Sequence, residues 1–479
     1  MKVLAFDFGA SNGRAIVGEF DGKQLKMEVI HRFPNSPDER DGGLYWNFGR
    51  LFGEVKEALQ KCGKIDAIGV DTWGVDFGLI DKEGNLICDP RNYRDEYSKP
   101  MVSVAAERVG KSTLYKKTGI QTMNFNTLFQ LLAVNENDPE LMAKTDKFLF
   151  MPDLFNYMLT GNMAAEYTVA STSEMINAEA RDWDFEIIEK AGLRKDIFLP
   201  IKKTGEIVGT LKPEFGLGDV PVIAVGSHDT ASAVAAVPFE NYETEAYISS
   251  GTWSLMGLEL DHPVLTEVSE KFDVTNEGGV GGKIRYLKNI MGLWLVQQCK
   301  GQWEKEGEEL SYDDITQLAL NAAPHIAFID PDNEMFTAPG DMPSRIREFC
   351  KRTGQTIPNT KGEIIRVALE SLAFKYKNTL EALEEITGRK IDTIHVIGGG
   401  SQNELLCRFA ASVSGRCVTA GPIEATAIGN MMVQLMALGE IKSLEQIREA
   451  VKASTPVKTF KPEEDWTEIY PRFLEIEGK

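Results

Sequence analysis

The sequence predicts an α/β protein made of two duplicated domains, and three observations support this prediction. The chain has 479 residues, which is more than one hydrophobic core ordinarily serves, so that two or three domains are expected. The pattern K-I-D-x-I-x-V occurs twice, as KIDAIGV at 64–70 and as KIDTIHV at 390–396. A looser pair, AFDFGASNGRAIVGEF at 5–20 and AYISSGTWSLMGLEL at 246–260, consists of apolar strands interrupted by glycine and small hydroxyl residues. Both pairs occur in the same order, which favours duplication over chance.

Each K-I-D strand follows an amphipathic helix that a glycine ends. Before the second copy, apolar residues recur at helical spacing from Ile365 to Leu383, and Gly388 supplies the stop. Before the first copy, a helix over about 51–59 ends similarly at Gly63. The polar stretch VPFENYETE at 237–245 predicts the boundary between a domain 1–240 and a domain 241–479. The longer spacing in the second half places an insertion between about 260 and 345.

Composition and charge narrow the class of function. With 43% hydrophobic and 26% charged residues, the chain is typical of a soluble globular protein. The formal net charge of -20 and the lack of a Lys/Arg cluster argue against nucleic acid as a partner. A small anion such as ATP can still bind where backbone N–H groups, a few donors and Mg²⁺ supply a local positive field.

The six cysteines are spread singly, without a C-x-x-C pair, as expected for reduced and mostly buried thiols. The N-terminus MKVLAFDFG enters a strand directly and lacks the basic run and apolar core of a signal peptide. No uncharged apolar run approaches the roughly 18 residues of a membrane helix. These features predict a cytoplasmic location.

The stretch FDFGASNGR at 6–14 raises two incompatible interpretations. Asp7-Phe8-Gly9 spells the magnesium-binding tripeptide of protein kinases, but the glycine-rich loop, the lysine and the H-R-D segment that should precede it are absent. The remaining interpretation is a turn between two strands, in which Gly9 and Gly13 flank Ala10, Ser11 and Asn12. Such a turn can present backbone N–H groups to phosphate oxygens, with Arg14 as a nearby positive charge. An ordinary β-hairpin is the alternative.

The stretch VIAVGSHDTASAVAAV at 222–237 reads as an apolar strand, four polar residues and a helix of small residues. A carboxylate at the C-terminal end of a strand is well placed to accept a proton from a substrate hydroxyl, which makes Asp229 a candidate base. Capping of the helix by Asp229 or Thr230 is the alternative. Metal binding by His228 is disfavoured, because the five histidines show no ligand spacing.

Two more stretches carry candidate chemistry. IHVIGGGSQN at 394–403 is a buried strand followed by three glycines, which suit close approach of a phosphorylated ligand or a tight packing turn. DTWGVDF at 71–77 joins an aromatic ring, a glycine and two carboxylates, as sugar sites often do. Trp73 could equally belong to the core.

Taken in order, these stretches resemble the FGGY family of carbohydrate kinases. The similarity covers essentially the whole chain and includes the strings DTWGVDF, MPDLFNYMLTG, SHDTASAV, SSGTWSLMG, NEGG and LKNIMGLWL. The resemblance implies two duplicated actin-like (ribonuclease H-like) ATPase domains with an interdomain cleft. It implies ATP and Mg²⁺ as cofactors, and a monomer or homodimer without nucleic-acid or membrane partners. The longer strings are most similar to members that convert L-rhamnulose to L-rhamnulose 1-phosphate.

The resemblance also assigns roles to matching positions. Asp229 is the expected proton acceptor, and the expected substrate-binding residues are Gly74, His228, Asp229, Thr230 and Asn289. The expected nucleotide-binding residues are Ala10, Ser11, Asn12, Gly13, Arg14, Thr252, Gln297 and Gly400. Asp7 is expected to help hold Mg²⁺ through water. The segments GQWEKEGEELSYDD at 301–314 and 340–360 depart from the family pattern, outside these positions.

Other functions remain open at this point. A kinase for another sugar, such as L-fuculose or D-xylulose, would share the same stretches. An actin-like nucleotide-binding ATPase would use the same two domains, with S-H-D-T only capping a helix. A sugar-responsive regulator would need a basic DNA-reading segment, which the sequence lacks.

Overall fold

The computed structural model describes residues 1–478 and divides them into two compact units. The first unit consists of Met1–Pro238, Glu259–Tyr286 and Ala425–Ser454, and the second of Phe239–Leu258, Leu287–Glu424 and the described residues from Thr455 onward. Each unit therefore combines segments that are far apart in the sequence. None of the helices among residues 1–478 is long and apolar enough to cross a membrane.

The first unit holds most of the strands and helices. Its strands are β1 (Lys2–Phe8), β2 (Asn12–Phe20), β3 (Leu25–Pro34), β4 (Asp38–Arg40), β5 (Gly43–Tyr45), β6 (Ala67–Thr72), β7 (Phe77–Ile80), β8 (Lys147–Phe150), β9 (Ala165–Glu166), β10 (Ile176–Asn177), β11 (Asp182–Trp183), β12 (Ile201–Lys202), β13 (Ile207–Thr210), β14 (Pro221–Ile223) and β17 (Thr275–Gly278). Its helices are α1 (Phe48–Lys61), α2 (Met101–Arg108), α3 (Lys111–Thr118), α4 (Thr127–Asn137), α5 (Pro139–Lys144), α6 (Met151–Thr160), α7 (Tyr167–Ala170), α8 (Phe185–Ala191), α9 (Asp229–Ala235), α10 (Glu267–Lys271), α16 (Ala425–Ala437) and α17 (Leu444–Ser454).

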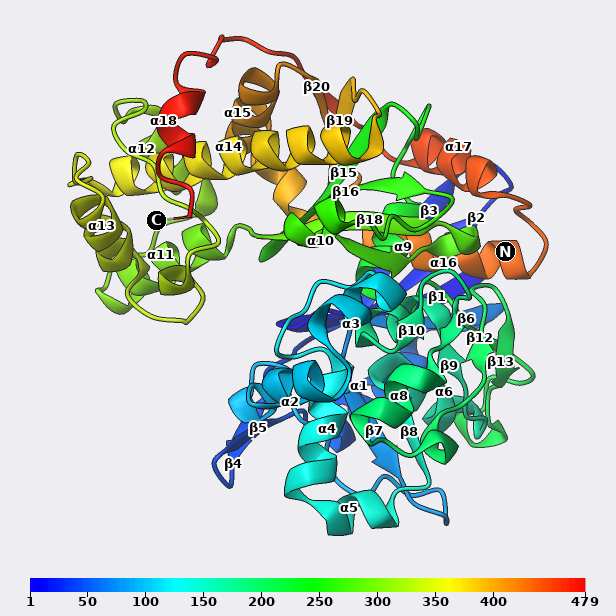
Figure 1. Cartoon of the computed structure of the whole chain (residues 1–479). Helices are drawn as coiled ribbons and strands as arrows, with labels where there is room; N and C mark the ends of the chain where they lie inside the picture. Colours follow the sequence, from blue (N-terminus) through cyan, green and yellow to red (C-terminus); the bar gives the residue numbers. More distant parts are fainter. Residues whose placement is uncertain (479) are drawn as a thin grey trace. The chain divides into compact units, whose positions relative to one another are not determined.

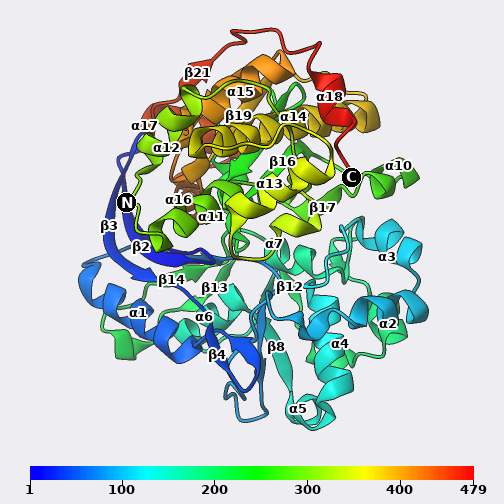
Figure 2. The same ribbon diagram turned by 90° about the vertical axis from the view of Figure 1, so that its left-hand side faces the viewer.

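The main sheet of this unit has the strand order β13-β14-β6-β1-β2-β3. β1 pairs antiparallel with β2 and parallel with β6. β2 in turn pairs antiparallel with β3, and these two strands lie side by side in Figure 2. Successive side chains of a strand point to opposite faces of the sheet. Phe6 and Phe8 therefore pack on one face with α1 and α6, where Phe155 stacks on Phe8 with ring centroids 4.4 Å apart.

The opposite face of this sheet carries α16. The amide of Gln434 donates to the carbonyl of Leu4 over 3.0 Å, and the Asn430 amide donates to the Asp71 carboxylate over 2.5 Å. A Cβ at Gly69 would overlap the Asn430 side chain, so glycine permits the close approach of this helix. Asp7 and Asp71 therefore belong to the face that α16 covers.

The second unit contains the other strands and helices. Its strands are β15 (Glu245–Ser250), β16 (Trp253–Leu260), β18 (Ile284–Met291), β19 (Thr393–Ile397), β20 (Cys417–Ala420) and β21 (Lys458–Phe460), of which β16 and β18 run on into the first unit's segment 259–286. Its helices are α11 (Trp294–Lys305), α12 (Tyr312–Leu320), α13 (Met342–Arg352), α14 (Lys361–Thr387), α15 (Glu404–Ser414) and α18 (Tyr470–Leu474).

The two units repeat one topology, which confirms the predicted duplication. The sheet that contains the second unit's strands has the order β17-β18-β16-β15-β19-β20-β21, with β15 antiparallel to β16 and parallel to β19. β1 has the same relations in the first unit, antiparallel to β2 and parallel to β6. Each K-I-D segment leads into the corresponding parallel strand, β6 or β19. The helix before β19 is α14, which lies beside α15 (Figure 1). It ends at Gly388, whose φ of 68° is the left-handed conformation that glycine favours.

Candidate active site

The turn between β1 and β2 is held by its own backbone and by Asn35. The N–H of Gly9 donates to the Asn12 carbonyl over 2.9 Å. The Asn35 backbone N–H donates to Ser11 O over 3.0 Å, and its side-chain amide donates to Gly9 O over 2.7 Å. Ser11 and Asn12 are exposed at the tip. The turn is therefore fixed at its base and open to solvent at its tip.

Gly13 is required by packing. Neither Gly9 nor Gly13 is among the glycines with positive φ in the described chain. A Cβ at Gly13 would overlap the ring of Phe33 on β3. The next residue, Arg14, pairs with the carboxylate of Asp7, so that positive and negative charge meet beside the turn.

Two carboxylates stand side by side next to this turn. Asp7 on β1 is directly opposite Asp71 on the parallel strand β6, and both are buried. Burial raises the pKa of Asp71 well above its usual range, and the charges of Asp7 and Asp229 raise it further. Asn430 satisfies one Asp71 oxygen, and the other, Oδ1, is buried without a hydrogen bond among the described residues. Such an arrangement favours a nearby cation.

Trp73 belongs to the core of the unit. It is 5% exposed, lies against Trp46 with ring centroids 4.1 Å apart, and donates its indole N–H to Asp76 over 2.9 Å. Asp76 also accepts hydrogen bonds from Trp46 and Gln130, and burial raises its pKa to about 6. Of the two interpretations that the sequence left open for Trp73, the structure supports the core residue.

Gly74 lies beside His228, another of the predicted sugar-binding residues. A Cβ at this position would stand 3.2 Å from Thr172 Oγ1 and 3.4 Å from His228 Nε2. Gly74 thus leaves room between these two side chains, which come from segments distant in the sequence.

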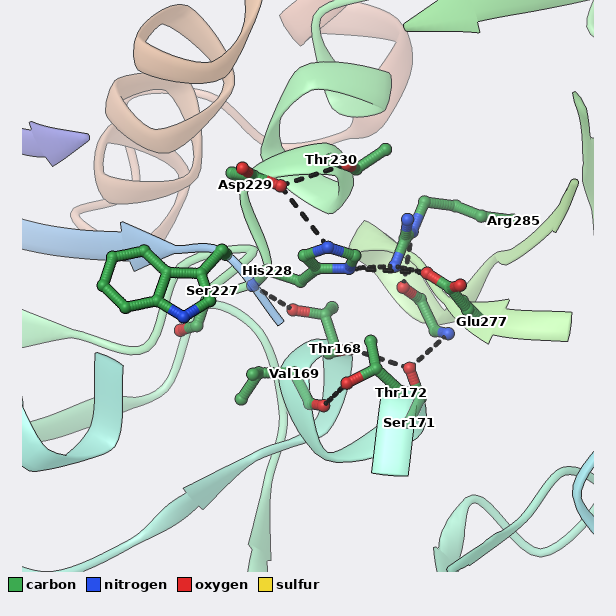
Figure 3. A network of polar contacts seen from close by, with 12 residues as sticks. Thr168, Val169, Ser171, Thr172, Ser227, His228, Asp229, Thr230, Glu277 and Arg285 are labelled. Atoms are coloured by element: carbon green, nitrogen blue, oxygen red, sulfur yellow. Dashed lines mark hydrogen bonds and ion pairs between the residues drawn. The ribbon is translucent and has the colours of Figure 1, made fainter. Parts of the chain in front are cut away.

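The S-H-D-T segment lies where β6 ends. The N–H of Thr72 donates to Ser227 O over 2.9 Å, and the His228 N–H donates to Thr168 Oγ1 over 3.2 Å. Asp229 begins α9, and no side chain caps this helix. The Asp229 carboxylate accepts a hydrogen bond from Thr230 Oγ1 over 3.0 Å and keeps 30% of its surface exposed (Figure 3). It is therefore available to a ligand, and the capping interpretation does not hold.

In the second unit, three predicted nucleotide-binding residues meet around the β15–β16 turn. The Thr252 hydroxyl donates to Gln297 Oε1 on α11 over 3.3 Å. The N–H of Leu293 donates to Gly251 O over 3.0 Å, which ties the turn to the start of α11. A Cβ at Gly400 would overlap the side chain of Ser250, so that the glycine turn lies directly against the end of β15. Asn289 is on β18 of the same unit.

The match to known families decides the classification. Residues 2–236 match the N-terminal domain of the FGGY family of carbohydrate kinases, and residues 246–438 match its C-terminal domain. The chain belongs to this FGGY family. The FGGY kinase is 44% identical to a rhamnulokinase of Bacteroides thetaiotaomicron, over 98% of each chain. It is 37% identical to a rhamnulokinase of Bacillus subtilis, over 97% of this chain and 96% of the relative.

Solved structures share the fold of the FGGY kinase. A xylulose kinase from Lactobacillus acidophilus, crystallised with a ligand, matches with a TM-score of 0.82 at 16% identity, over 99% of this chain and 97% of the other. A Plasmodium falciparum glycerol kinase with ADP matches with a TM-score of 0.79 at 15% identity, over 99% and 96%. At this identity the likeness concerns the fold alone.

The structure adds residues that the sequence reasoning missed. Asp71 belongs to the string DTWGVDF, but its pairing with Asp7 depends on strand register. Thr172 reaches Gly74 from a short helical turn after α7. Glu277 and Arg285 contact His228, and Glu277 lies within the string NEGG that carried the family resemblance. That string was the one signal that could have drawn attention to Glu277.

Proposed function

We propose that the chain transfers the γ-phosphoryl group of ATP to the 1-hydroxyl of L-rhamnulose, giving L-rhamnulose 1-phosphate in L-rhamnose catabolism. The observation that carries the proposal is the 44% identity to a rhamnulokinase over 98% of both chains. The strings most specific to this resemblance include the candidate sugar-binding residues.

Asp229 acts as the proton acceptor in this proposal. Its carboxylate is partly exposed and does not cap α9, so it can receive the proton of the attacking hydroxyl. Gly74, His228, Thr230 and Asn289 would bind the sugar. Removing the proton as the oxygen meets phosphorus avoids a positively charged bridging oxygen in the product.

The two turns would bind the nucleotide. In the first unit, Ala10 to Arg14 offer backbone N–H groups, hydroxyl and amide donors and one guanidinium for phosphate oxygens. In the second unit, Thr252 and Gln297 would contact the nucleotide, and Gly400 would lie at the adenosine region. Donors held in place before the reaction stabilise the charge that spreads over the transferred group.

The carboxylates beside the first turn fit a divalent cation. Asp71 has a buried oxygen without a hydrogen bond among the described residues, next to the buried Asp7. Hard cations such as Mg²⁺ prefer oxygen ligands, and Mg²⁺ usually keeps several waters. Asp7 and Asp71 would hold the ion, directly or through water. When bound, Mg²⁺ offsets the negative charge of the phosphate oxygens.

The proposal includes a cytoplasmic enzyme that works as a monomer or homodimer, with sugar and ATP as its ligands and no nucleic-acid or membrane partner. The six cysteines, all free in the structure, support a reducing compartment. The net charge of -20 disfavours polyanionic partners.

A panel of ketoses assayed for ADP release tests the substrate. The panel contains L-rhamnulose, L-fuculose, D-xylulose and D-fructose at equal concentration with Mg²⁺-ATP. We expect the highest kcat/KM for L-rhamnulose and a 1-phosphate product by NMR. Preference for L-fuculose or D-xylulose would replace the substrate assignment. ADP release that no sugar stimulates would favour a nucleotide-binding ATPase without kinase activity.

A further inference from the structure

The two ring nitrogens of His228 have contrasting surroundings (Figure 3). Nδ1 faces a buried pair, with Arg285 Nη2 at 3.0 Å and Glu277 Oε2 at 3.4 Å. Nε2 faces the opposite side, where it lies 3.4 Å from Asp229 Oδ1 and borders the space left by Gly74. The question is which nitrogen carries the proton.

The contact with Arg285 determines which ring nitrogen of His228 carries the proton. A guanidinium has five N–H donors and no acceptor, so an Arg285 N–H directed at Nδ1 requires a lone pair on that nitrogen. A neutral imidazole carries its proton on the other nitrogen, which is Nε2. The hydrogen bond from Arg285 therefore selects the form of His228 that presents Nε2–H toward Asp229 and Gly74.

Glu277 has the opposite effect on His228, because a carboxylate beside Nδ1 favours a proton on that nitrogen. The position of the proton therefore depends on Arg285. Its carboxylate lies 2.9 Å from Arg285 Nη2 and 3.4 Å from His228 Nδ1. Burial raises the pKa of Glu277, but opposing interactions, of which the charge of Arg285 is the largest, outweigh burial and lower the pKa below its ordinary value. With Arg285 removed, the ionised Glu277 would be the nearest partner of Nδ1 and would attract a proton there.

The guanidinium is buried and held by a backbone carbonyl. Arg285 has an exposed fraction of 0%, and its Nε–H donates to Gly278 O over 2.8 Å. The N–H of Gly278 in turn donates to Ser171 Oγ over 2.7 Å, which ties β17 to the loop that carries Thr172. A buried arginine that is held by Gly278 O and by the Glu277 carboxylate has little freedom to move away from His228.

We propose that Arg285 is a positioning residue that fixes His228 with its proton on Nε2, so that His228 donates a hydrogen bond to an acceptor oxygen of the sugar beside Asp229. This inference rests on the proposed function and deepens it. Asp229 accepts a proton from the sugar hydroxyl. His228, in contrast, donates a hydrogen bond to the sugar and retains its own proton. The site then favours sugars with a carbonyl, ring or hydroxyl oxygen that can accept a hydrogen bond at that position.

The protonation pattern can be measured without any sugar. The chain has five histidines, so selective ¹⁵N labelling gives a small set of ring signals, and the set missing in His228→Gln belongs to His228. We expect Nδ1 of His228 to show the chemical shift of an unprotonated ring nitrogen and Nε2 that of a protonated one. A protonated Nδ1 in the wild-type protein, as the other tautomer or as imidazolium, would overturn the proposal.

Variants of Arg285 and Glu277 test whether Arg285 determines the protonation of the His228 ring. In Arg285→Met, Nδ1 should become protonated, because Glu277 becomes its nearest partner. Glu277→Gln keeps the arginine and should keep the wild-type pattern. Because one unpaired buried charge destabilises a protein strongly, the double variant Arg285→Met/Glu277→Met provides a folded protein without either charge. In the double variant neither charge acts on Nδ1, so protonation of Nδ1 should be less complete than in Arg285→Met. An unchanged pattern in both Arg285 variants would contradict the role of Arg285.

Steady-state kinetics test whether the position of the His228 proton affects sugar binding. Arg285→Met should raise KM for the sugar at least about tenfold, the worth of one hydrogen bond, with KM for ATP unchanged. Arg285→Lys keeps the charge and a donor and should recover part of the loss. The matched control is Arg448→Met, which breaks another buried pair of the first unit, where Arg448 lies 2.7 Å from Glu259. An equal rise in KM for the sugar in Arg448→Met would assign both effects to stability alone.

The two proposals fail in distinguishable ways. The ring signals of His228 are recorded in the protein without substrate, so they judge the Arg285 inference even if the ketose panel yields another sugar. Phosphorylation of L-rhamnulose together with a protonated Nδ1 would leave the proposed function standing and remove the inference.

Discussion

Asp7 and Asp71 lie directly opposite each other on the paired parallel strands β1 and β6. Each side chain points to the face of the sheet that α16 covers, and the Asn430 amide of α16 binds Asp71 over 2.5 Å. Two adjacent buried carboxylates repel each other unless a proton or a cation intervenes. This relationship connects the strand register of the first unit with the metal requirement of the proposed reaction.

Replacing one member of this pair should weaken the response to Mg²⁺. In Asp7→Asn, the Mg²⁺ concentration that gives half the maximal rate should rise about 10- to 100-fold, the usual cost of losing a group that supports a bound metal. A titration of the rate with Mg²⁺ at saturating sugar measures it. Asp66→Asn is the control, because Asp66 binds the Lys2 N–H at the opposite end of the same strands. An unchanged Mg²⁺ requirement in Asp7→Asn would remove Asp7 from the metal site.

Asp229→Asn should abolish most of the turnover. Asparagine cannot accept the proton of the sugar hydroxyl, and we expect kcat to fall at least about a hundredfold. The affinity for ATP, measured by calorimetry, should stay near that of the wild type. Asp219→Asn, a carboxylate outside the site, serves as the control. Turnover near the wild-type value in Asp229→Asn would show that another group accepts the proton.

Gly74→Ala should narrow the sugar site. The new Cβ would stand 3.2 Å from Thr172 Oγ1 and 3.4 Å from His228 Nε2, in space that a sugar would otherwise use. We expect a higher KM for the ketose and little change in KM for ATP. Gly53→Ala is the control, since a Cβ there meets nothing within 4 Å on α1 and should stabilise the helix by about 0.5–1 kcal/mol. A KM for the ketose like that of the wild type would place the sugar elsewhere.

Glu174 should make stability depend on pH. Burial raises its pKa from 4.5 to about 7, against hydrogen bonds from Thr122 and Asn126. Because the folded chain then binds this proton more tightly than the unfolded chain, the contribution to stability is full below pH 4.5 and is lost as pH rises through 7. The loss is on the order of 3 kcal/mol.

Glu174→Gln removes that titration. Thermal unfolding between pH 5 and pH 8 should show a smaller fall of Tm with rising pH in this variant than in the wild type. The Thr122 hydroxyl can turn to accept from the new amide, so the site stays hydrogen-bonded. Glu179→Gln makes the same change at an exposed position. If Tm falls equally with rising pH in Glu174→Gln and in the wild type, Glu174 is ionised throughout this pH range.

The fold could be predicted because its signals are local. The K-I-D strings, the glycines that end helices and the alternating strands are read within about twenty residues, and the structure confirms the duplicated α/β topology. The match of whole strings to a family added the sugar-kinase class, which the family comparison confirms. The role of each site residue stays a prediction.

The rest of the site depends on contacts across long sequence distances. Nothing in the sequence near Trp73 reveals that Trp46 and Asp76 enclose it. Likewise, Arg285 reads as an ordinary charged residue of a strand, although the fold buries it completely against His228. Burial of a charge is decided by tertiary packing, and periodicity does not report it.

The position of α16 also constrains how the chain can be made. This helix covers one face of the sheet that contains β1, yet residues 425–437 are synthesised long after β1, β2 and β6. Strands β1, β2 and β6 therefore lack this cover until α16 has been synthesised. A fragment that stops at residue 240 would lack this cover, and its sheet would be prone to associate with other chains.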